Sequence, residues 1–143
     1  MKKAKRLLAI LGVSIIAMSA FSLPVSAANT SDTSYTFKFD FFGKSNTEGR
    51  SKRDASSTYI KCNQIPSGGF WVYVDGSTSS NGSWTDRTIG EPKVTRTGEF
   101  FINQLVYENG ERYARLGGYC WGASKNATGC WSPDSVGSYP VLN

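Results

Sequence analysis

Alternation of apolar and polar side chains is the feature that most limits what this chain can fold into. Residues 35–41 carry an aromatic ring at every second position, with Thr36, Lys38 and Asp40 between them. This is the period of a β-strand that buries one face. In the chain that follows, no stretch of ten or more residues has apolar side chains at the three- and four-residue spacing of a helix. The sequence therefore predicts strands and no long helix.

Further strand-like runs are separated by turn-forming residues, and residues 43–57, rich in Gly, Ser, Thr and charge, are predicted to be a long loop. Asn109-Gly110 separates two of these runs and favours a β-hairpin, because both residues tolerate positive φ. Six to eight short strands predict an antiparallel β-sandwich or a partly open β-barrel. The other predicted strands are residues 58–63, 70–75, 84–88, 93–97, 100–107, 112–121 and 129–132.

The first 27 residues have the pattern of a secretory signal peptide. Four basic residues precede the apolar run 7–21, Pro24 interrupts it, and Val25-Ser26-Ala27 supplies a small-residue cleavage motif. Cleavage is expected after Ala27 or, one position later, after Ala28. The pattern predicts a secreted protein without a transmembrane anchor, consisting of one domain, residues 28–143, that begins with a flexible polar tail, residues 28–34.

The charge of this domain gives no reason to expect nucleic acid or an anionic membrane as its partner. Residues 28–143 contain 12 basic and 11 acidic side chains, which leaves a net charge of +1. The one basic cluster is Arg50, Lys52 and Arg53, flanked by Glu48 and Asp54. We interpret it as a solvated loop, with anion docking or proteolytic nicking as alternatives.

Three cysteines in a chain predicted to be exported allow at most one internal disulfide. Cys120 and Cys130 are the favoured pair, since only nine residues lie between them and the intervening loop contains glycine. Pairing of Cys62 with either of them stays open. The remaining cysteine is interpreted as a small buried apolar residue.

Aromatic side chains are the strongest candidates for ligand binding. In the strand predicted at residues 70–75, alternation puts Trp71 and Tyr73 together on the face opposite Phe70 and the two valines. Either both faces of this strand are buried, which is the commoner use of aromatic residues in strands, or Trp71 and Tyr73 form a surface that stacks on a ligand. Trp84 is a third candidate for that surface.

Catalytic, metal-binding and cofactor-binding residues are not predicted. The sequence has no histidine, which excludes Ser-His-Asp and Cys-His catalysis. It also has no phosphate-binding glycine loop, no EF-hand loop and no nucleophile elbow. A hydrolase would have to use carboxylates, and nothing in their spacing selects a pair. The candidates are Asp75, Asp86, Glu99, Glu108, Glu111 and Asp134.

Several segments carry a resemblance to a known group. With the signal peptide, the chain resembles a group of small secreted proteins of Gram-positive bacteria that is classed as a domain of unknown function. The resemblance implies export and a small β-rich fold, and it carries no functional residue. The segments are residues 35–42, 98–103, 113–116 and 129–135.

Three functions follow as hypotheses. The first is a non-enzymatic secreted domain that binds an extracellular or cell-surface ligand, such as cell-wall glycan, through Trp71, Tyr73 and Trp84. The second is a bacteriocin-like protein that acts on a surface component of related bacteria. The third is a carboxylate-dependent hydrolase. The oligomeric state is not predicted.

Overall fold

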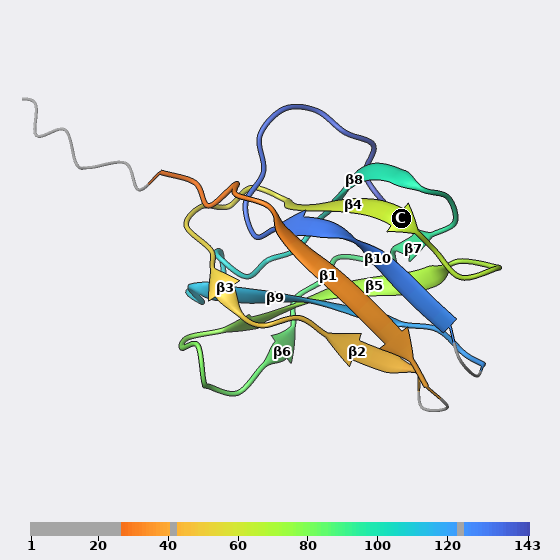
Figure 1. The fold of residues 1–143 in the computed structure, drawn as a ribbon. Coiled ribbons are helices and arrows are strands. Elements are labelled where there is room, and N and C mark those ends of the chain that lie inside the picture. Colours follow the sequence, from red (N-terminus) through yellow and green to blue (C-terminus); the bar gives the residue numbers. More distant parts are fainter. Residues whose placement is uncertain (1–26, 41–42, 123–124) are drawn as a thin grey trace, which may run out of the picture.

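The computed structural model describes residues 27–40, 43–122 and 125–143. These residues form two antiparallel sheets that stack on one another (Figure 1). The four-stranded sheet has the order β1-β10-β4-β8, and the six-stranded sheet has the order β2-β9-β5-β6, with β3 also pairing with β9 and β7 with β5. The strands are β1 (Thr33–Phe39), β2 (Lys44–Asn46), β3 (Arg50–Ser51), β4 (Thr58–Gln64), β5 (Phe70–Ser77), β6 (Thr85–Asp86), β7 (Lys93–Val94), β8 (Gly98–Ile102), β9 (Tyr113–Tyr119) and β10 (Lys125–Ser132).

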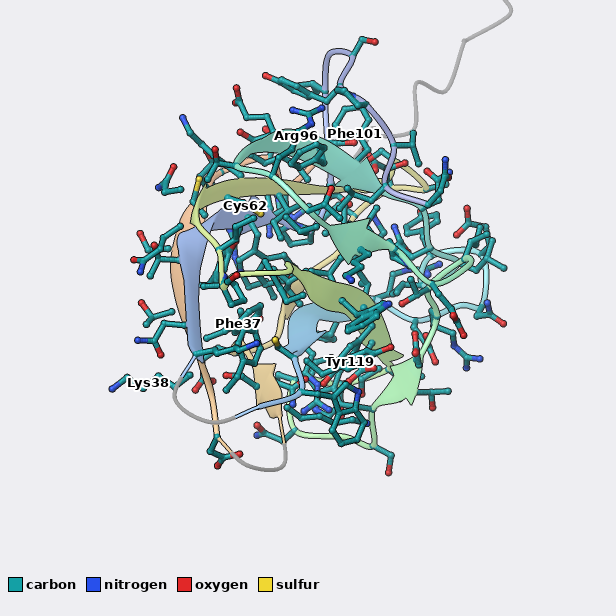
Figure 2. The ribbon with its side chains drawn as sticks, turned by 90° about the vertical axis from the view of Figure 1, so that its right-hand side faces the viewer. Phe37, Lys38, Cys62, Arg96, Phe101 and Tyr119 are labelled. Carbon is teal, nitrogen blue, oxygen red and sulfur yellow. The ribbon has the colours of Figure 1, made fainter. Side chains whose placement is uncertain are left out.

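The core lies between the sheets, where the alternating side chains of each strand meet. In β1 the side chains of Tyr35, Phe37 and Phe39 are buried, and those between them are exposed. Figure 2 shows Phe37 pointing into the space between the sheets and Lys38 pointing away from the molecule. The same alternation buries apolar residues of β5 from the other side, and Phe70 contacts both Phe37 and Phe39. Period-two alternation therefore predicted the correct inner face of these strands.

The predicted fold class is confirmed, because the described residues form two antiparallel sheets and no helix. Since they form no helix at all, none of them provides a helix long and apolar enough to cross a membrane. The number of strands is larger than predicted. The segment expected to be one long loop contains β2 and β3, which pair with β9 along the edge of the six-stranded sheet.

The hairpin predicted at Asn109-Gly110 is wrong. The strand before it, β8, pairs with β4 in one sheet, whereas the strand after it, β9, pairs with β5 in the other sheet. Gly110 does adopt a positive φ of 79°, as the turn prediction requires. The turn connects the two layers of the sandwich, because local turn geometry does not determine which partner each strand finds.

The amino-terminal segment expected to be a flexible tail is hydrogen-bonded to the domain. The backbone N–H of Asn29 donates to Asp134 Oδ2 over 2.6 Å, and its side-chain amide donates to the carbonyl of Ser51 over 2.8 Å. Strand β1 then begins at Thr33. The predicted signal peptide falls almost entirely on residues 1–26, which lie outside the described residues.

Candidate ligand-binding site

The outward-facing side of the six-stranded sheet carries the aromatic residues that the sequence singled out. Strand register places four side chains in one row across it, with Trp71 beside Lys93 on one flank and beside Tyr119 on the other. Tyr119 in turn lies beside Lys44 of β2. Directly opposite residues in a sheet are close enough for their side chains to touch. The row therefore reads cation, aromatic, aromatic, cation.

Trp71 has both faces of its indole ring covered by neighbours in this row. The ring of Tyr119 stacks on it with centroids 5.3 Å apart and planes only 8° from parallel. The ammonium of Lys93 lies 4.3 Å from the centroid of the same ring. Trp71 consequently serves as a wall of the site and does not offer a free face for stacking.

Tyr73 lies in the adjacent row and adopts a different orientation. Its partner across the strand pair is Gly117, and beyond Gly117 lies Asn46. A Cβ atom on Gly117 would come within 2.1 Å of the Tyr73 ring, so the ring lies down over the glycine. The Tyr73 hydroxyl donates a hydrogen bond of 2.8 Å to Asn46 Oδ1. Tyr73 therefore covers the sheet as a half-buried floor, and Lys44 Nζ lies 5.9 Å from its centroid.

Charged residues form the third row. Asp75 lies opposite Asp86 on one side and opposite Arg115 on the other. Arg115 donates to Asp75 Oδ2 through Nε at 2.8 Å and through Nη2 at 2.7 Å. Burial is the larger influence on the pKa of Asp75 and raises it, although Arg115 acts to lower it. The row supplies fixed hydrogen-bonding groups on the opposite side of Tyr73 from Trp71.

These rows enclose a groove of about 650 Å³, which we call the aromatic groove. Its floor is Tyr73, its aromatic wall is Trp71 with Tyr119, and its polar wall is the row of Asp75 and Arg115. Such a combination of apolar surface with a few converging polar groups is typical of ligand-binding sites. Other lining residues include Trp121, of which 70% is exposed, and Glu91.

Trp84 does not line the aromatic groove, although the sequence grouped it with Trp71 and Tyr73. Its ring lies against Gly49, where a Cβ atom would come within 2.5 Å of it. The Arg115 guanidinium lies 4.9 Å from the Trp84 centroid. Trp84 thus supports the arginine that holds Asp75, and its role is positioning.

The structure brings Trp71 and Tyr73 together as predicted and adds residues that sequence analysis missed. Tyr119, Gly117 and Arg115 belong to the site because β9 pairs with β5 along its length. Alternation within residues 113–119 identifies them as one face of a strand. The pairing of that strand with β5, which a local pattern does not encode, is what places them beside Tyr73.

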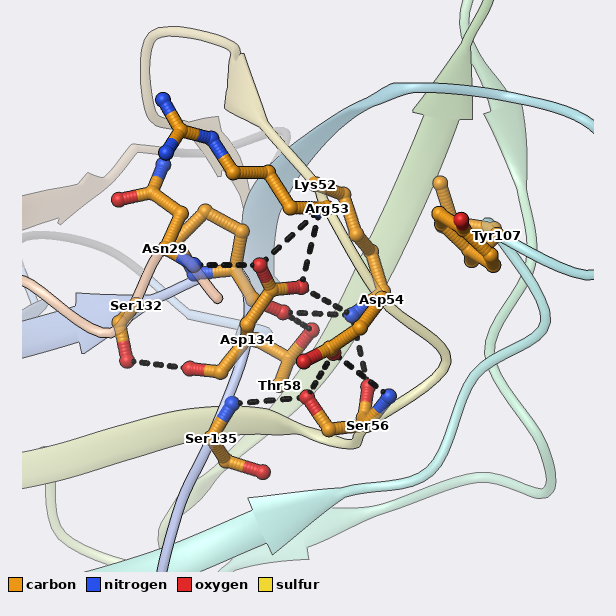
Figure 3. Close-up of polar contacts among 12 residues, drawn as sticks. Asn29, Lys52, Arg53, Asp54, Ser56, Thr58, Tyr107, Ser132, Asp134 and Ser135 are labelled. Carbon is orange, nitrogen blue, oxygen red and sulfur yellow. Dashed lines mark hydrogen bonds and ion pairs between the residues drawn. The ribbon is translucent and has the colours of Figure 1, made fainter. Parts of the chain in front are cut away.

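The basic cluster is not the solvated loop that the sequence suggested, because Lys52 is buried and its ammonium lies among polar partners (Figure 3). Its ammonium donates to Asp134 Oδ1 over 3.0 Å and to the carbonyls of Ser56 and Pro133. Asp134 also accepts from the backbone N–H groups of Asn29 and Arg53. Burial lowers the pKa of Lys52, against the influence of Asp134. With this many partners, the pair is a structural centre and Asp134 is not a catalytic candidate.

The remaining predicted carboxylates are spread over the molecule. Glu111 is held by the Arg87 guanidinium at 2.8 Å, and Glu99 accepts a 2.5 Å hydrogen bond from the Tyr59 hydroxyl. Glu108 is exposed in the turn before β9. Only Asp75 and Asp86 face each other across a strand pair within the aromatic groove. The part of the chain that the structure describes has no cluster of three or more residues arranged to hold a metal ion.

The disulfide expected between Cys120 and Cys130 is not formed, and all three cysteines are free thiols. Cys120 follows β9 and is buried, with its thiol donating to the carbonyl of Gly69 over 3.4 Å. Cys130 belongs to β10 in the opposite sheet, between two buried neighbours, so its side chain points outward toward Asp32. The two thiols therefore face different environments.

This arrangement predicts an order of thiol reactivity in the native protein. We expect Cys130 to be alkylated first, because Cys62 and Cys120 are 2% and 4% exposed. Burial raises the pKa of Cys62 to about 11, and burial together with Asp32 also raises the pKa of Cys130, so the expected order rests on exposure. Iodoacetamide labelling followed by peptide mass spectrometry measures the order. Protection of Cys120 and Cys130 together, relieved only by a reductant, would instead show that the two are bridged.

Comparison with known proteins places the whole aromatic groove inside one family domain. The family model described as "Protein of unknown function (DUF2712)" matches residues 23–135. The chain belongs to this family. No curated protein and no solved structure matches the chain. The family assignment confirms the resemblance to a domain of unknown function, and the DUF2712 segment includes every strand that lines the groove.

Proposed function

We propose that this DUF2712 protein is a secreted, non-enzymatic binding module whose aromatic groove holds a glycan. The observation that carries the proposal is Tyr73, whose ring lies flat on Gly117 and forms the floor of an open groove. Aromatic rings supply large, rigid contact area at low entropic cost. A sugar ring is flat enough to stack on such a floor while its hydroxyls reach polar groups beside it.

The polar walls fit the same ligand class. Asp75 is held in position by Arg115, and Asp86 accepts hydrogen bonds from Thr88, which leaves ordered carboxylates at one side of the floor. The Lys44 ammonium, 5.9 Å from the Tyr73 centroid, supplies a donor at the edge of the groove. Carboxylates and ammonium groups together bond to hydroxyls as both acceptors and donors. This arrangement supports a polyhydroxylated ligand better than a purely apolar one.

Substitution of Tyr73 tests the proposal. We expect Tyr73→Ala to weaken binding to cell-wall glycan by about thirtyfold, the effect of losing a central aromatic contact of roughly 2 kcal/mol. Pull-down on insoluble glycan and calorimetry with soluble fragments measure the loss. The matched control is Tyr107→Ala, which removes an aromatic ring outside the groove that packs under Arg112. Equal binding by the unmodified protein and the Tyr73 variant would overturn the proposal.

A carboxylate-dependent hydrolase is the second candidate. It is favoured because Asp75 and Asp86 lie opposite each other across a strand pair within the groove. Two carboxylates beside a bound sugar are the equipment of most glycosidases, and a raised pKa on one of them suits a general acid. Release of reducing ends from the bound glycan, lost in both Asp75→Asn and Asp86→Asn, would establish it. A pure binding module releases none.

A further inference from the structure

A second cavity, of about 370 Å³, opens at the side of the sandwich. At this side, β1 is the edge strand of the four-stranded sheet and β2 is the edge strand of the six-stranded sheet, and the two lie next to one another, as Figure 1 shows. The cavity is lined by the first residues of β1, by the segment from Asn46 to Arg50, and by Trp131 of β10. We call it the lateral cavity. Two of its lining residues carry a hydrogen-bond donor or a positive charge that the protein itself does not fully pair, and both indicate the same kind of ligand.

Trp131 is the first of these residues. Its side chain is fully buried, and its Nε1 is the one buried side-chain nitrogen or oxygen of the described residues without a hydrogen-bond partner. The indole N–H is a donor only, so it requires an acceptor atom. A buried donor left unpaired is costly, and it is rare in folded proteins. Trp131 lines the lateral cavity, and an acceptor that reached Nε1 from the cavity would remove this cost.

Arg50 is the second. Its guanidinium lies 5.6 Å from the centroid of the Trp131 ring. It donates to the carbonyl of Trp131, to Asn29 Oδ1 and to Ser31 Oγ, all of which are neutral acceptors. No ion pair joins it to a carboxylate in the part of the chain described.

The charges around Arg50 leave its cation only partly compensated. Burial lowers the pKa of Arg50, with Asp32 and Asp134 acting in the opposite direction from a distance. Glu48 is the other charged lining residue of the lateral cavity, and it is exposed. The cavity thus combines a half-buried cation with an unpaired donor. A carboxylate would pair with both groups, because its two oxygens accept charge-assisted hydrogen bonds.

Asn46 connects this cavity to the proposed glycan site. It lines both the aromatic groove and the lateral cavity. A chain of sugars that stacks one ring on Tyr73 can therefore continue past Asn46 toward Arg50. We propose that the lateral cavity binds the carboxylate of an acidic sugar within that glycan, with Arg50 and the Trp131 indole N–H as its donors. The inference rests on the proposed function for the ligand's identity as a glycan.

Two matched pairs of ligands test the inference on the complete domain. The first pair is glucuronate and glucose, which differ in a single carboxylate. The second is an oligogalacturonate and its methyl ester, which have the same backbone with and without charge. We expect the acidic member of each pair to shift the Trp131 indole N–H signal in nitrogen-labelled protein, and the neutral member to leave it in place. Trp131→Phe assigns that signal.

Substitution of Arg50 supplies the second readout. Arg50→Gln should weaken oligogalacturonate binding by about tenfold or more, as loss of a charge-assisted hydrogen bond does. It should leave binding of the methyl ester unchanged. Should Arg50→Gln fail to fold, the monomer titration of the unmodified protein decides alone. An unmoved Trp131 signal with glucuronate, or equal affinity for the oligomer and its ester, overturns the carboxylate site.

The outcomes separate this inference from the proposed function. Binding of both oligomers with loss in Tyr73→Ala, but no response of Trp131, removes the carboxylate site and keeps the glycan groove. A response of Trp131 to glucuronate, with no effect of Tyr73→Ala on any glycan, keeps the carboxylate site and removes the groove. Competition by acetate at equal concentration would show that the cavity takes a carboxylate without the sugar, and would overturn its role in glycan recognition.

Discussion

Asp134→Ala lowers the free energy of unfolding by about 3–5 kcal/mol, the largest loss of stability that we expect from substitution of any single buried polar residue of this domain. The carboxylate has no exposed surface and faces the Lys52 ammonium at 3.0 Å. Its removal leaves that ammonium buried without an anion and deprives the Asn29 and Arg53 backbone amides of their acceptor. Urea titration measures the loss, and the thermal midpoint should fall by roughly 10 °C or more.

A double variant separates the charge from the packing. Lys52→Met combined with Asp134→Ala removes the uncompensated cation, so the pair should lose less stability than Asp134→Ala alone. Glu91→Ala is the matched control, because the Glu91 carboxylate is exposed, and it should change stability by less than about 0.5 kcal/mol. A loss of under about 1 kcal/mol in Asp134→Ala would contradict burial of the pair as a structural centre.

The sequence correctly predicted features that depend on local alternation, and its predictions were wrong for features that depend on partners distant in the chain. The strand at residues 35–41 appears as β1, and its aromatic face is the buried one. The same local reasoning placed a hairpin at Asn109-Gly110, yet β8 and β9 pair with different strands in different sheets. The positive φ of Gly110 is compatible with either outcome, and the connection between β8 and β9 spans residues 103–112. The choice follows from which faces need to be covered once the sandwich forms.

The candidate site shows the same limit at the level of side chains. Alternation put Trp71 and Tyr73 on one face, and the structure keeps them there. Their different roles come from what lies opposite each of them. Trp71 faces Tyr119 and stacks upright against it, whereas Tyr73 faces Gly117 and lies down. Lys52 shows the same limit, because a lysine in a cluster with Arg50 and Arg53 gives no local sign of its buried partner 82 residues away.

Gly117→Ala is expected to reduce glycan binding by more than about a hundredfold, a larger effect than truncation of Tyr73 itself. The new Cβ atom would lie 2.1 Å from the Tyr73 ring and 2.7 Å from Asn46 Oδ1, closer than any real contact. The ring has to tip away from the sheet, which breaks its hydrogen bond to Asn46. Because the tipped ring moves into the aromatic groove, the substitution removes the floor and also fills the space above it.

The double variant Tyr73→Ala with Gly117→Ala decides whether this mechanism is right. Without the Tyr73 ring the clash with that ring is gone, and the Asn46 amide, which has lost its hydrogen bond to Tyr73, is free to turn away from the new Cβ atom. The double variant should therefore bind no more weakly than Tyr73→Ala alone. Its stability should recover relative to Gly117→Ala, since alanine in a strand is favoured over glycine once the ring is absent and the Asn46 amide has turned away. Calorimetry and urea unfolding of the four proteins complete the cycle. Losses that simply add would show that Gly117 acts on the glycan through something other than the Tyr73 ring.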